Sequence, residues 1–206
     1  MNKLLAKLVL LFLASPLLLH AQQPDFTTEN LPGGESLPAV ALKTNLLTDL
    51  TGTFNLGAEF RLSDYLTLDL SANYNPWTFS DNRKLKHFQV QSELRYWVHE
   101  PFNGHFLGAH VNYTNFNVGN LNLPLNIFSD LKDHRLQGNG YGVGVAYGYQ
   151  WLLSPRWSME ASLGLGYMYL DYSRYECHTC GKKLNKNNKH YFGPTKLGVS
   201  LIYIIK

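Results

Sequence analysis

Charge, cysteine and long apolar runs are all scarce in this sequence. Charged side chains make up 16% of the 206 residues, only two cysteines are present, and the net charge is +3. So small a basic excess gives no electrostatic case for nucleic acid as a partner. Hydrophobic residues nevertheless reach 45% and aromatic residues 14%, which excludes a disordered or collagenous chain and allows one domain with a sizeable core.

The first 21 residues have the pattern of a secretory signal peptide. Two lysines precede an apolar run from Leu8 to Ala14, and the segment ends in the small residue Ala21. The run is too short to span a bilayer, so we expect cleavage after Ala21 rather than a membrane anchor. No cysteine follows the expected cut, which disfavours a lipoprotein.

Residues 22–38 are rich in proline and glycine, and their only charged residues are Asp25, Glu29 and Glu35. This composition predicts a flexible acidic tail in front of the domain. Once Lys3 and Lys7 are removed with the leader, the net charge of the remaining chain is +1. The domain itself is expected to occupy residues 39–206.

From Val40 onward the hydrophobic pattern has a period of two, and helical periodicity is weak. No segment after the leader is apolar enough for a transmembrane helix. The pattern predicts eight strands: Val40 to Leu47, Thr53 to Leu62, Tyr65 to Trp77, Leu85 to Val98, His105 to Val118, Gly140 to Leu153, Trp157 to Asp171 and Tyr191 to Ile205.

The connections between these strands alternate in length. Short links follow the second, fourth and sixth strands, whereas longer links cover Thr78 to Lys84, Gly119 to Asn139 and Tyr172 to His190. Alternating short turns and long loops are typical of an antiparallel up-and-down β-barrel. The expected fold class is therefore all-β, an eight-stranded antiparallel up-and-down β-barrel; the two faces of its strands, described next, make a transmembrane β-barrel the expected form.

The two faces of the strands differ sharply, and they allow two kinds of barrel. One face is apolar, and the other is mostly Gly, Ser, Asn and Gln with a few balanced charges. A soluble ligand-binding barrel would turn the apolar face inward. Small and amide side chains suit a narrow lumen better than a solvated surface, so we expect the apolar face to contact lipid. Aromatic residues at both strand ends would form the interfacial girdles: Tyr96, Trp151, Trp157 and Tyr203 at the short-turn rim, and Tyr74, Tyr113, Tyr141, Tyr167 and Tyr169 at the other.

An eight-stranded barrel is just wide enough for side chains to fill, which makes a diffusion pore improbable. The lumen face carries four basic and four acidic residues, and buried charges are tolerated when they are paired. We therefore predict a neutral salt-bridge network that seals the lumen, made of Lys43, Glu59, Arg61, Asp69, Glu93, Arg95, Glu160 and Lys196. A small gated channel, opened by exchange of ion-pair partners, is the alternative.

His110 is the one histidine expected at mid-strand inside the lumen, either as a hydrogen-bonded lumen residue or as a base or pH-sensitive gate. A lipid-modifying enzyme would place a catalytic histidine near the outer rim, where His87 and His190 are expected. No Ser, Asp or Glu stands at a spacing that singles out a triad. The sequence therefore favours a protein that is not an enzyme and needs no cofactor.

The last long loop carries the sharpest local motif and a basic patch. In an exported loop, Cys177 and Cys180 favour a local disulfide over a redox pair or a zinc site. A zinc site would need two more ligands, for which His178 and His190 are the nearest candidates, and a second CxxC pair is missing. Five basic residues lie in the same predicted loop: Arg174, Lys182, Lys183, Lys186 and Lys189. If that loop is extracellular, it would lie beside lipopolysaccharide phosphates or acidic glycans; a merely solvated loop is the alternative.

Several short stretches resemble a family of uncharacterised outer-membrane barrels from Bacteroidota. They are KTNLL from Lys43, NLGAEF from Asn55, NPW from Asn75, ELRYW from Glu93, YGYQW from Tyr147, Tyr175-Glu176-Cys177 with Cys180-Gly181, and YFGPTK from Tyr191. The resemblance covers roughly Ala41 to the end and implies a barrel in the outer membrane. Some members lie in operons with fimbrial components, which implies a link to surface assembly.

The last strand also resembles the C-terminal signal that the barrel-assembly machinery binds. Lys196, Gly198, Leu201 and Tyr203 fill its places, although the chain ends in Lys206 rather than an aromatic residue. The expected protein is a non-enzymatic outer-membrane scaffold or surface-interaction protein with its long loops outside and its tail in the periplasm. Its expected partners are membrane lipid, lipopolysaccharide, the assembly machinery and a surface or fimbrial protein.

Overall fold

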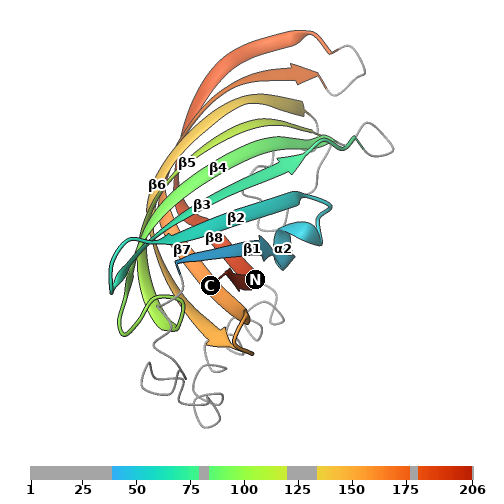
Figure 1. The fold of residues 1–206 in the computed structure, drawn as a ribbon. Coiled ribbons are helices and arrows are strands. Elements are labelled where there is room, and N and C mark those ends of the chain that lie inside the picture. Colours follow the sequence, from blue (N-terminus) through green and yellow to red (C-terminus); the bar gives the residue numbers. More distant parts are fainter. Residues whose placement is uncertain (1–38, 79–83, 120–133, 177–180, 206) are drawn as a thin grey trace, which may run out of the picture.

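A computed structural model describes residues 39–78, 84–119, 134–176 and 181–205, which form a closed barrel of eight antiparallel strands (Figure 1). The predicted all-β, up-and-down architecture is confirmed. The elements are β1 (Val40–Asn45), α2 (Leu46–Asp49), β2 (Phe54–Arg61), β3 (Leu66–Asn75), β4 (Lys84–Trp97), β5 (Gly104–Gly119), β6 (His134–Leu152), β7 (Trp157–Glu176) and β8 (Lys183–Ile205).

Each strand pairs with the next one along the chain, and β8 closes the ring against β1. Val40 at the start of β1 lies opposite Ile205 at the end of β8. The two ends of the barrel domain therefore lie side by side at one rim. No helix among the described residues is both long enough and apolar enough to cross a membrane.

The wall of the barrel is much taller on one side than on the other. Strand length rises from 6 residues in β1 to 23 in β8. Only Ser200 to Ile205 of β8 pairs with β1, whereas β7 pairs with β8 from Lys183 to Tyr203. The first half of β8 and the end of β7 consequently extend beyond the short strands, at the top of Figure 1.

This extension corrects three predicted boundaries. β6 begins at His134 instead of Gly140, β7 continues to Glu176 instead of Asp171, and β8 begins at Lys183 instead of Tyr191. These strand ends carry polar residues on both faces, so the alternation of apolar residues, on which the prediction depended, does not extend to them. The backbone ladder continues regardless, because its hydrogen bonds require no particular side chain.

The first strand ends two residues earlier than predicted because Asn45 turns the chain into α2. The Asn45 side-chain oxygen accepts a hydrogen bond from the Leu47 N–H at 3.1 Å, in the manner of a helix N-cap. The same oxygen accepts from the Val199 N–H at 3.3 Å, and the Asn45 amide donates to the Leu197 carbonyl at 3.2 Å. One side chain therefore joins the start of α2 to the edge of β8.

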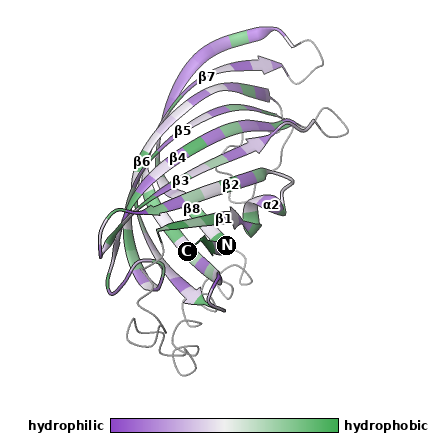
Figure 2. Cartoon of the chain, viewed as in Figure 1, coloured by the Kyte–Doolittle hydropathy of each residue, from purple (hydrophilic) through white to green (hydrophobic). Residues whose placement is uncertain are grey.

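Polarity in the barrel is reversed relative to a water-soluble protein. Charged and amide side chains are buried inside, including Glu59 and Glu93, both with no exposed area. Large apolar side chains face outward: Leu56 is 65% exposed and Val145 is 66% exposed. Figure 2 shows hydrophilic residues predominating in the tall extension of β7 and β8.

Several predicted features lie outside the described residues. They are the signal peptide over residues 1–21, the acidic tail over residues 22–38, and the pair Cys177 and Cys180. These remain predictions from the sequence.

Replacing Asn45 by Ala is expected to lower the free energy of unfolding by about 1 to 2 kcal/mol, because it removes the cap of α2 and the contacts with β8. The measurement is urea unfolding of the refolded barrel in detergent, followed by tryptophan fluorescence. Asn185→Ala on exposed β8 is the matched control and should change stability by less than about 0.5 kcal/mol. Equal effects of the two substitutions would contradict the capping role.

Candidate functional site: a charged cluster in the lumen

Three carboxylates lie in one row across neighbouring strands. The register places Glu59 of β2 opposite Asp69 of β3, and Asp69 opposite Glu93 of β4. Directly opposed like charges destabilise a sheet. The row therefore requires cations inside the lumen.

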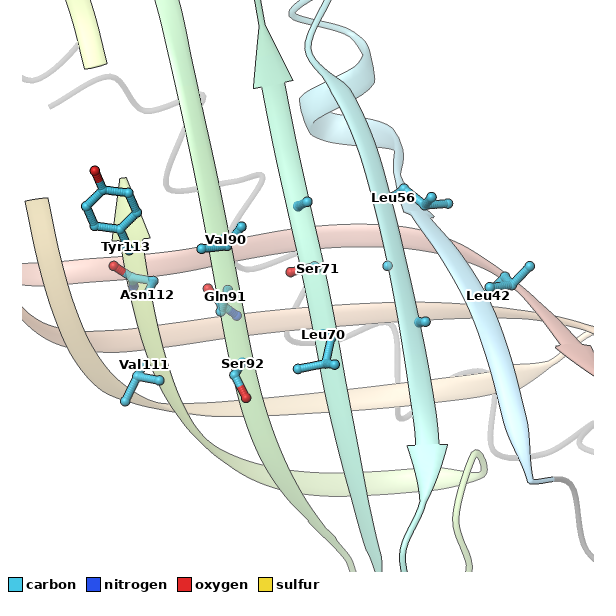
Figure 3. A pocket seen from close by; sticks show the side chains of 13 residues that line it. Leu42, Leu56, Leu70, Ser71, Val90, Gln91, Ser92, Val111, Asn112 and Tyr113 are labelled. Atoms are coloured by element: carbon cyan, nitrogen blue, oxygen red, sulfur yellow. The ribbon is translucent and has the colours of Figure 1, made fainter. Parts of the chain in front are cut away.

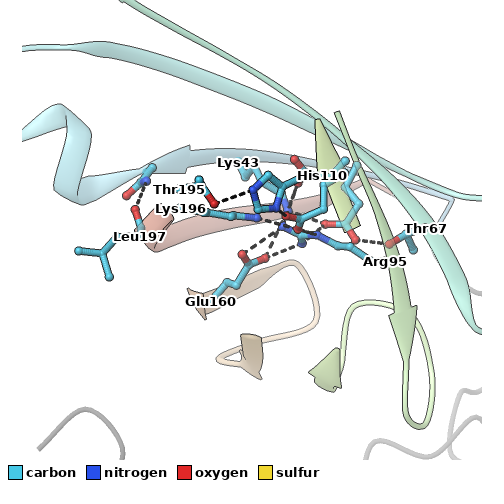
Figure 4. Close-up of polar contacts among 12 residues, drawn as sticks. Lys43, Thr67, Arg95, His110, Glu160, Thr195, Lys196 and Leu197 are labelled. Atoms are coloured by element: carbon cyan, nitrogen blue, oxygen red, sulfur yellow. Dashed lines mark hydrogen bonds and ion pairs between the residues drawn. The ribbon is translucent and has the colours of Figure 1, made fainter. Parts of the chain in front are cut away.

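Arg95 supplies most of the positive charge that compensates these carboxylates. It lies two residues beyond Glu93 on β4 and therefore on the same face. Its Nη1 lies 2.7 Å from Oε2 of Glu59 and 2.7 Å from Oε2 of Glu160. Its Nε donates to Glu93 Oε1 at 2.8 Å, and its Nη2 lies 3.3 Å from Asp69 Oδ2. Arg95 thus joins the carboxylate row to Glu160 on β7 (Figure 4).

Two lysines on other strands complete the compensation of the carboxylates. Lys43 Nζ on β1 contacts the carboxylates of Glu59 and Asp69, each at 2.5 Å, and lies 3.3 Å from Glu160. Lys196 Nζ on β8 donates to Glu93 Oε1 at 2.7 Å. We call the seven residues the lumen cluster: Lys43, Glu59, Asp69, Glu93, Arg95, Glu160 and Lys196.

Glycines on the inner face make room for these side chains. A Cβ added to Gly57 would lie 2.6 Å from Cγ of Lys43, and one added to Gly108 would lie 2.8 Å from Cδ of Glu93. Both distances are shorter than real Cβ contacts allow. The glycine-rich inner face that the sequence shows is therefore the space in which the long charged side chains lie.

Three aromatic residues close the lumen below the lumen cluster, toward the short-turn rim. Trp97, Phe102 and Phe106 have at most 1% exposed area, and we call them the aromatic floor. The Arg95 guanidinium lies 4.3 Å from the centroid of the Phe106 ring, and Trp97 Nε1 donates to Thr67 Oγ1 at 2.9 Å. Thr67 in turn donates to Glu59 at 2.5 Å, so the floor and the lumen cluster are directly connected.

The sequence pattern indicates that two of these aromatic residues face the lumen. Trp97 lies two residues after Arg95 and Phe106 lies two residues before Gly108, so the period of two places both on the inner face. Phe102 had no such signal, because it lies in the turn between β4 and β5 with a φ of 67°. Its ring reaches a buried apolar group at the base of the lumen, made of Ala41, Ile202 and Ile204.

Amide side chains line the lumen on the other side of the lumen cluster. Asn55 donates to Asn73, and Asn73 donates to the Gln89 side-chain oxygen at 3.2 Å; we call these three the amide ladder. A cavity of about 120 Å³ lies between the amide ladder and the charges, and Ser162 and Ser200 also line it. The filled part of the lumen is therefore the lower half, and polar space remains above it.

Seven of the eight residues predicted for the network converge, and Arg61 does not. Arg61 is the last residue of β2, and its Nη2 lies 2.5 Å from Oδ1 of Asp64 in the following turn, where Asp64 is 80% exposed. The structure therefore contradicts the inclusion of Arg61 in the network. The seven residues that remain in the lumen cluster are three basic and four acidic side chains.

The histidines contact groups that position their rings. His110 Nε2 lies 2.9 Å from Thr195 Oγ1, and its Nδ1 lies 3.4 Å from Glu93 Oε2. His190 Nδ1 lies 2.5 Å from the Tyr167 hydroxyl, and His87 Nδ1 lies 3.1 Å from the Leu85 carbonyl. Of these contacts, only that of His110 involves a carboxylate.

The predicted basic surface loop is corrected by the strand boundaries. Arg174 lies in β7, whereas Lys183, Lys186 and Lys189 lie in β8; only Lys182 lies in the described part of the connection. Alternation along β8 sends these side chains to both faces rather than to one patch. Lys186 donates to Asp171 at 2.9 Å, and this hydrogen bond raises the pKa of its ammonium group.

A second hollow, of about 580 Å³, lies on the outer face of β1 to β5. Its lining includes Leu56, Leu70, Val90 and Val111, with small residues such as Ser92 between them (Figure 3). Such a lining offers contact area for apolar groups.

Taken together, the geometry defines a closed eight-stranded barrel whose lumen is filled by a charged cluster above an aromatic floor. A family model for a protein of unknown function, DUF3575, matches residues 8–205. The chain belongs to that family. No curated protein matches the sequence.

Replacing Arg95 by Met should lower the free energy of unfolding by about 3 to 5 kcal/mol, because it leaves the facing carboxylates buried without their shared cation. Arg61→Met is the matched control and should lower it by less than about 1 kcal/mol, since its partner is exposed. Urea titration in detergent measures both. A similar loss for the two variants would show that the lumen cluster does not depend on Arg95.

Proposed function

We propose that this protein is an integral outer-membrane barrel that acts as a non-enzymatic scaffold or surface-interaction protein. The observation that carries the proposal is the reversed polarity: buried charges inside and exposed apolar side chains outside. In water, an apolar surface that surrounds the whole barrel would aggregate. In a bilayer, the same surface is in its preferred solvent, and the closed ring leaves no unpaired strand edge in lipid.

The outer face of β7 fits the thickness of a bilayer. Outward positions alternate from Met159 through Leu163 and Leu165 to Tyr167, and the next outward charged residue is Asp171. A spanning strand requires about 9 to 11 residues. The interval from Met159 to Tyr167 is nine residues, and the tall polar extension begins beyond it.

Aromatic rings gather near both ends of this apolar interval. At the short-turn end the rings of Trp157 and Tyr203 lie 5.0 Å apart. At the other end the rings of Tyr113 and Tyr141 lie 5.4 Å apart. Two aromatic girdles are the usual boundary of a membrane barrel.

Orientation follows from the connections. The short turns after β2, β4 and β6 share a rim with both ends of the domain. Short turns of bacterial barrels face the periplasm. The β7–β8 extension would then project from the cell and offer a surface to lipopolysaccharide or to a protein partner, including a fimbrial one. The resemblance to Bacteroidota outer-membrane barrels, and the match of β8 to an assembly signal, support the same location.

The filled lumen favours a scaffold over a channel. The aromatic floor and six of the seven residues of the lumen cluster are buried, and their side chains occupy the cross-section. The rim histidines also favour a structural role over that of a general base, because His190 contacts a tyrosine hydroxyl and His87 contacts a backbone carbonyl. The lipid-modifying enzyme is therefore the weaker proposal.

Cell fractionation followed by electrophoresis tests the location. We expect the protein in the outer-membrane fraction, with a different mobility before and after boiling, because folded barrels resist detergent at room temperature. A periplasmic protein whose mobility does not change would overturn the proposal. It would instead favour a soluble barrel.

A charge on the proposed lipid face provides a second test. Val145→Arg should reduce the free energy of folding into lipid vesicles by about 2 to 4 kcal/mol, because it places a guanidinium near the middle of the bilayer. Gln137→Arg lies on the same face of β6 but in the tall extension, and should change it by at most about 1 kcal/mol. Equal tolerance of both substitutions would argue against lipid around Val145.

A further inference from the structure

The first part of β8 is an edge strand within the part of the chain that the structure describes. Pairing with β1 begins only at Ser200, and the Asn45 side chain meets the same edge at Leu197 and Val199. Before these positions, β8 pairs on one side only, with β7. Figure 1 shows this part of β8 as the outermost ribbon of the tall extension. We call Lys183 to Tyr191 of β8 the open edge.

The open edge lies beyond the apolar interval of the barrel wall. Its residues are opposite Met168 to Tyr175 of β7, whereas the apolar interval ends at Tyr167. Six of its nine side chains are exposed, and the other three are partly exposed. A macromolecule in water can therefore reach it.

The backbone of the open edge has hydrogen-bonding groups that point away from β7. In an antiparallel ladder, alternate residues direct their N–H and C=O groups to opposite sides of the strand, so about four residues direct theirs to the unpaired side. Such a row of donors and acceptors is a template for one more strand. An extended peptide of about nine residues would match its length.

The charge around the open edge indicates the character of that strand. Between Asp171 and Tyr191, the described residues carry five basic and two acidic side chains. The acidic residues are Asp171 and Glu176, and the basic residues are Arg174, Lys182, Lys183, Lys186 and Lys189. Asp171 compensates one of them, because it lies 2.9 Å from Lys186 Nζ. The remaining excess is positive and favours an acidic partner.

The lysines lie on both faces of the open edge. Lys186 is opposite Ser173 and Lys189 is opposite Leu170; these β7 residues are three apart and therefore on opposite faces. A basic patch on one face would suit a flat anionic surface such as lipid headgroups. Basic side chains on both faces suit an added strand, whose own side chains lie beside them on either face.

A second copy of the open edge is a poor occupant. Pairing two such edges would bring lysines of one strand close to lysines of the other, and like charges opposite one another destabilise a sheet. Lysines on edge strands protect natural sheets from pairing with identical edges in this way. An acidic strand has no such penalty.

We propose that the open edge binds an extended acidic segment of a partner protein by β-strand addition. The backbone of the segment completes the hydrogen bonds of β8, and its carboxylates lie beside the lysines on both faces. The inference rests on the proposed surface-interaction function and specifies the strand that binds and the kind of partner.

Fluorescence anisotropy of a labelled peptide tests the proposal. The probe is the acidic peptide ETVETVETE, titrated with the barrel in an uncharged detergent. We expect saturable binding with a Kd below about 1 mM, weakened about tenfold when glutamine replaces glutamate. The same peptide with all interior amides N-methylated keeps its charges but lacks donors, and it should not bind. No binding of the acidic peptide, or equal binding of the N-methylated one, would overturn the proposal.

Amide hydrogen exchange locates the bound peptide. We expect slower exchange in Lys183 to Tyr191 when the acidic peptide is present, because added backbone hydrogen bonds protect the amides that face the unpaired side. Binding without such protection would mean attraction by charge alone and would contradict strand addition. Binding of lipopolysaccharide without binding of the peptide would also contradict it, and would make the extension a site for anionic glycans.

A double variant tests the role of the lysines. Lys183→Glu combined with Lys189→Glu should weaken binding of the acidic peptide about tenfold or more. Lys86→Glu is the matched control, because Lys86 is exposed on β4 and pairs with β5, and it should bind the peptide as the wild type does. Circular dichroism verifies that each variant is folded. Equal weakening by the control would contradict binding at the open edge.

These measurements are separate from the test of location. Binding is measured in detergent, so it does not depend on where the protein lies in the cell. A barrel found in the outer membrane that fails to bind the peptide would overturn the inference alone.

Discussion

Arg95 contacts carboxylates from four strands, and the rest of the structure depends on this arrangement. Glu59, Asp69 and Glu93 lie in one row of the sheet, and Glu160 reaches the same guanidinium from β7. These contacts cross the lumen, so they fix the distance between walls that share no backbone hydrogen bonds. The guanidinium fork suits this role because it presents several donors in one plane.

The lumen cluster also accounts for the composition of the barrel. Long charged side chains fill the lower lumen only because the facing positions are glycine or serine, as at Gly57 and Gly108. An interior filled by paired charges leaves the apolar residues for the outside. Seven charged side chains lie inside the barrel, whereas the other charged residues of the described part lie in the connections, at the strand ends and in the extension of β7 and β8.

Side chains of different kinds lie at different heights along the barrel. The aromatic floor closes the short-turn end, the lumen cluster lies above it, and the amide ladder and cavity follow. Above these, β7 and β8 continue as a polar extension.

The sequence by itself determined the eight strands, the two faces and most of the lumen cluster. Alternation with a period of two places Glu59 and Arg95 on the inner face, and this does not depend on how the barrel closes. It could not determine how the ring closes or how far the strands extend. Arg61 has the same alternation as Glu59, yet it pairs with Asp64 in the turn, because it ends β2 while Arg95 reaches the carboxylate row.

Tertiary structure alone decided the register between β8 and β1, the insertion of Phe102 from a turn, and the absence of Arg61 from the lumen cluster. These features depend on distances between residues far apart in the chain. A local pattern carries no information on such distances. Pairing across a lumen is set by the closure of the barrel, whereas the face of each residue is set by the backbone of its own strand.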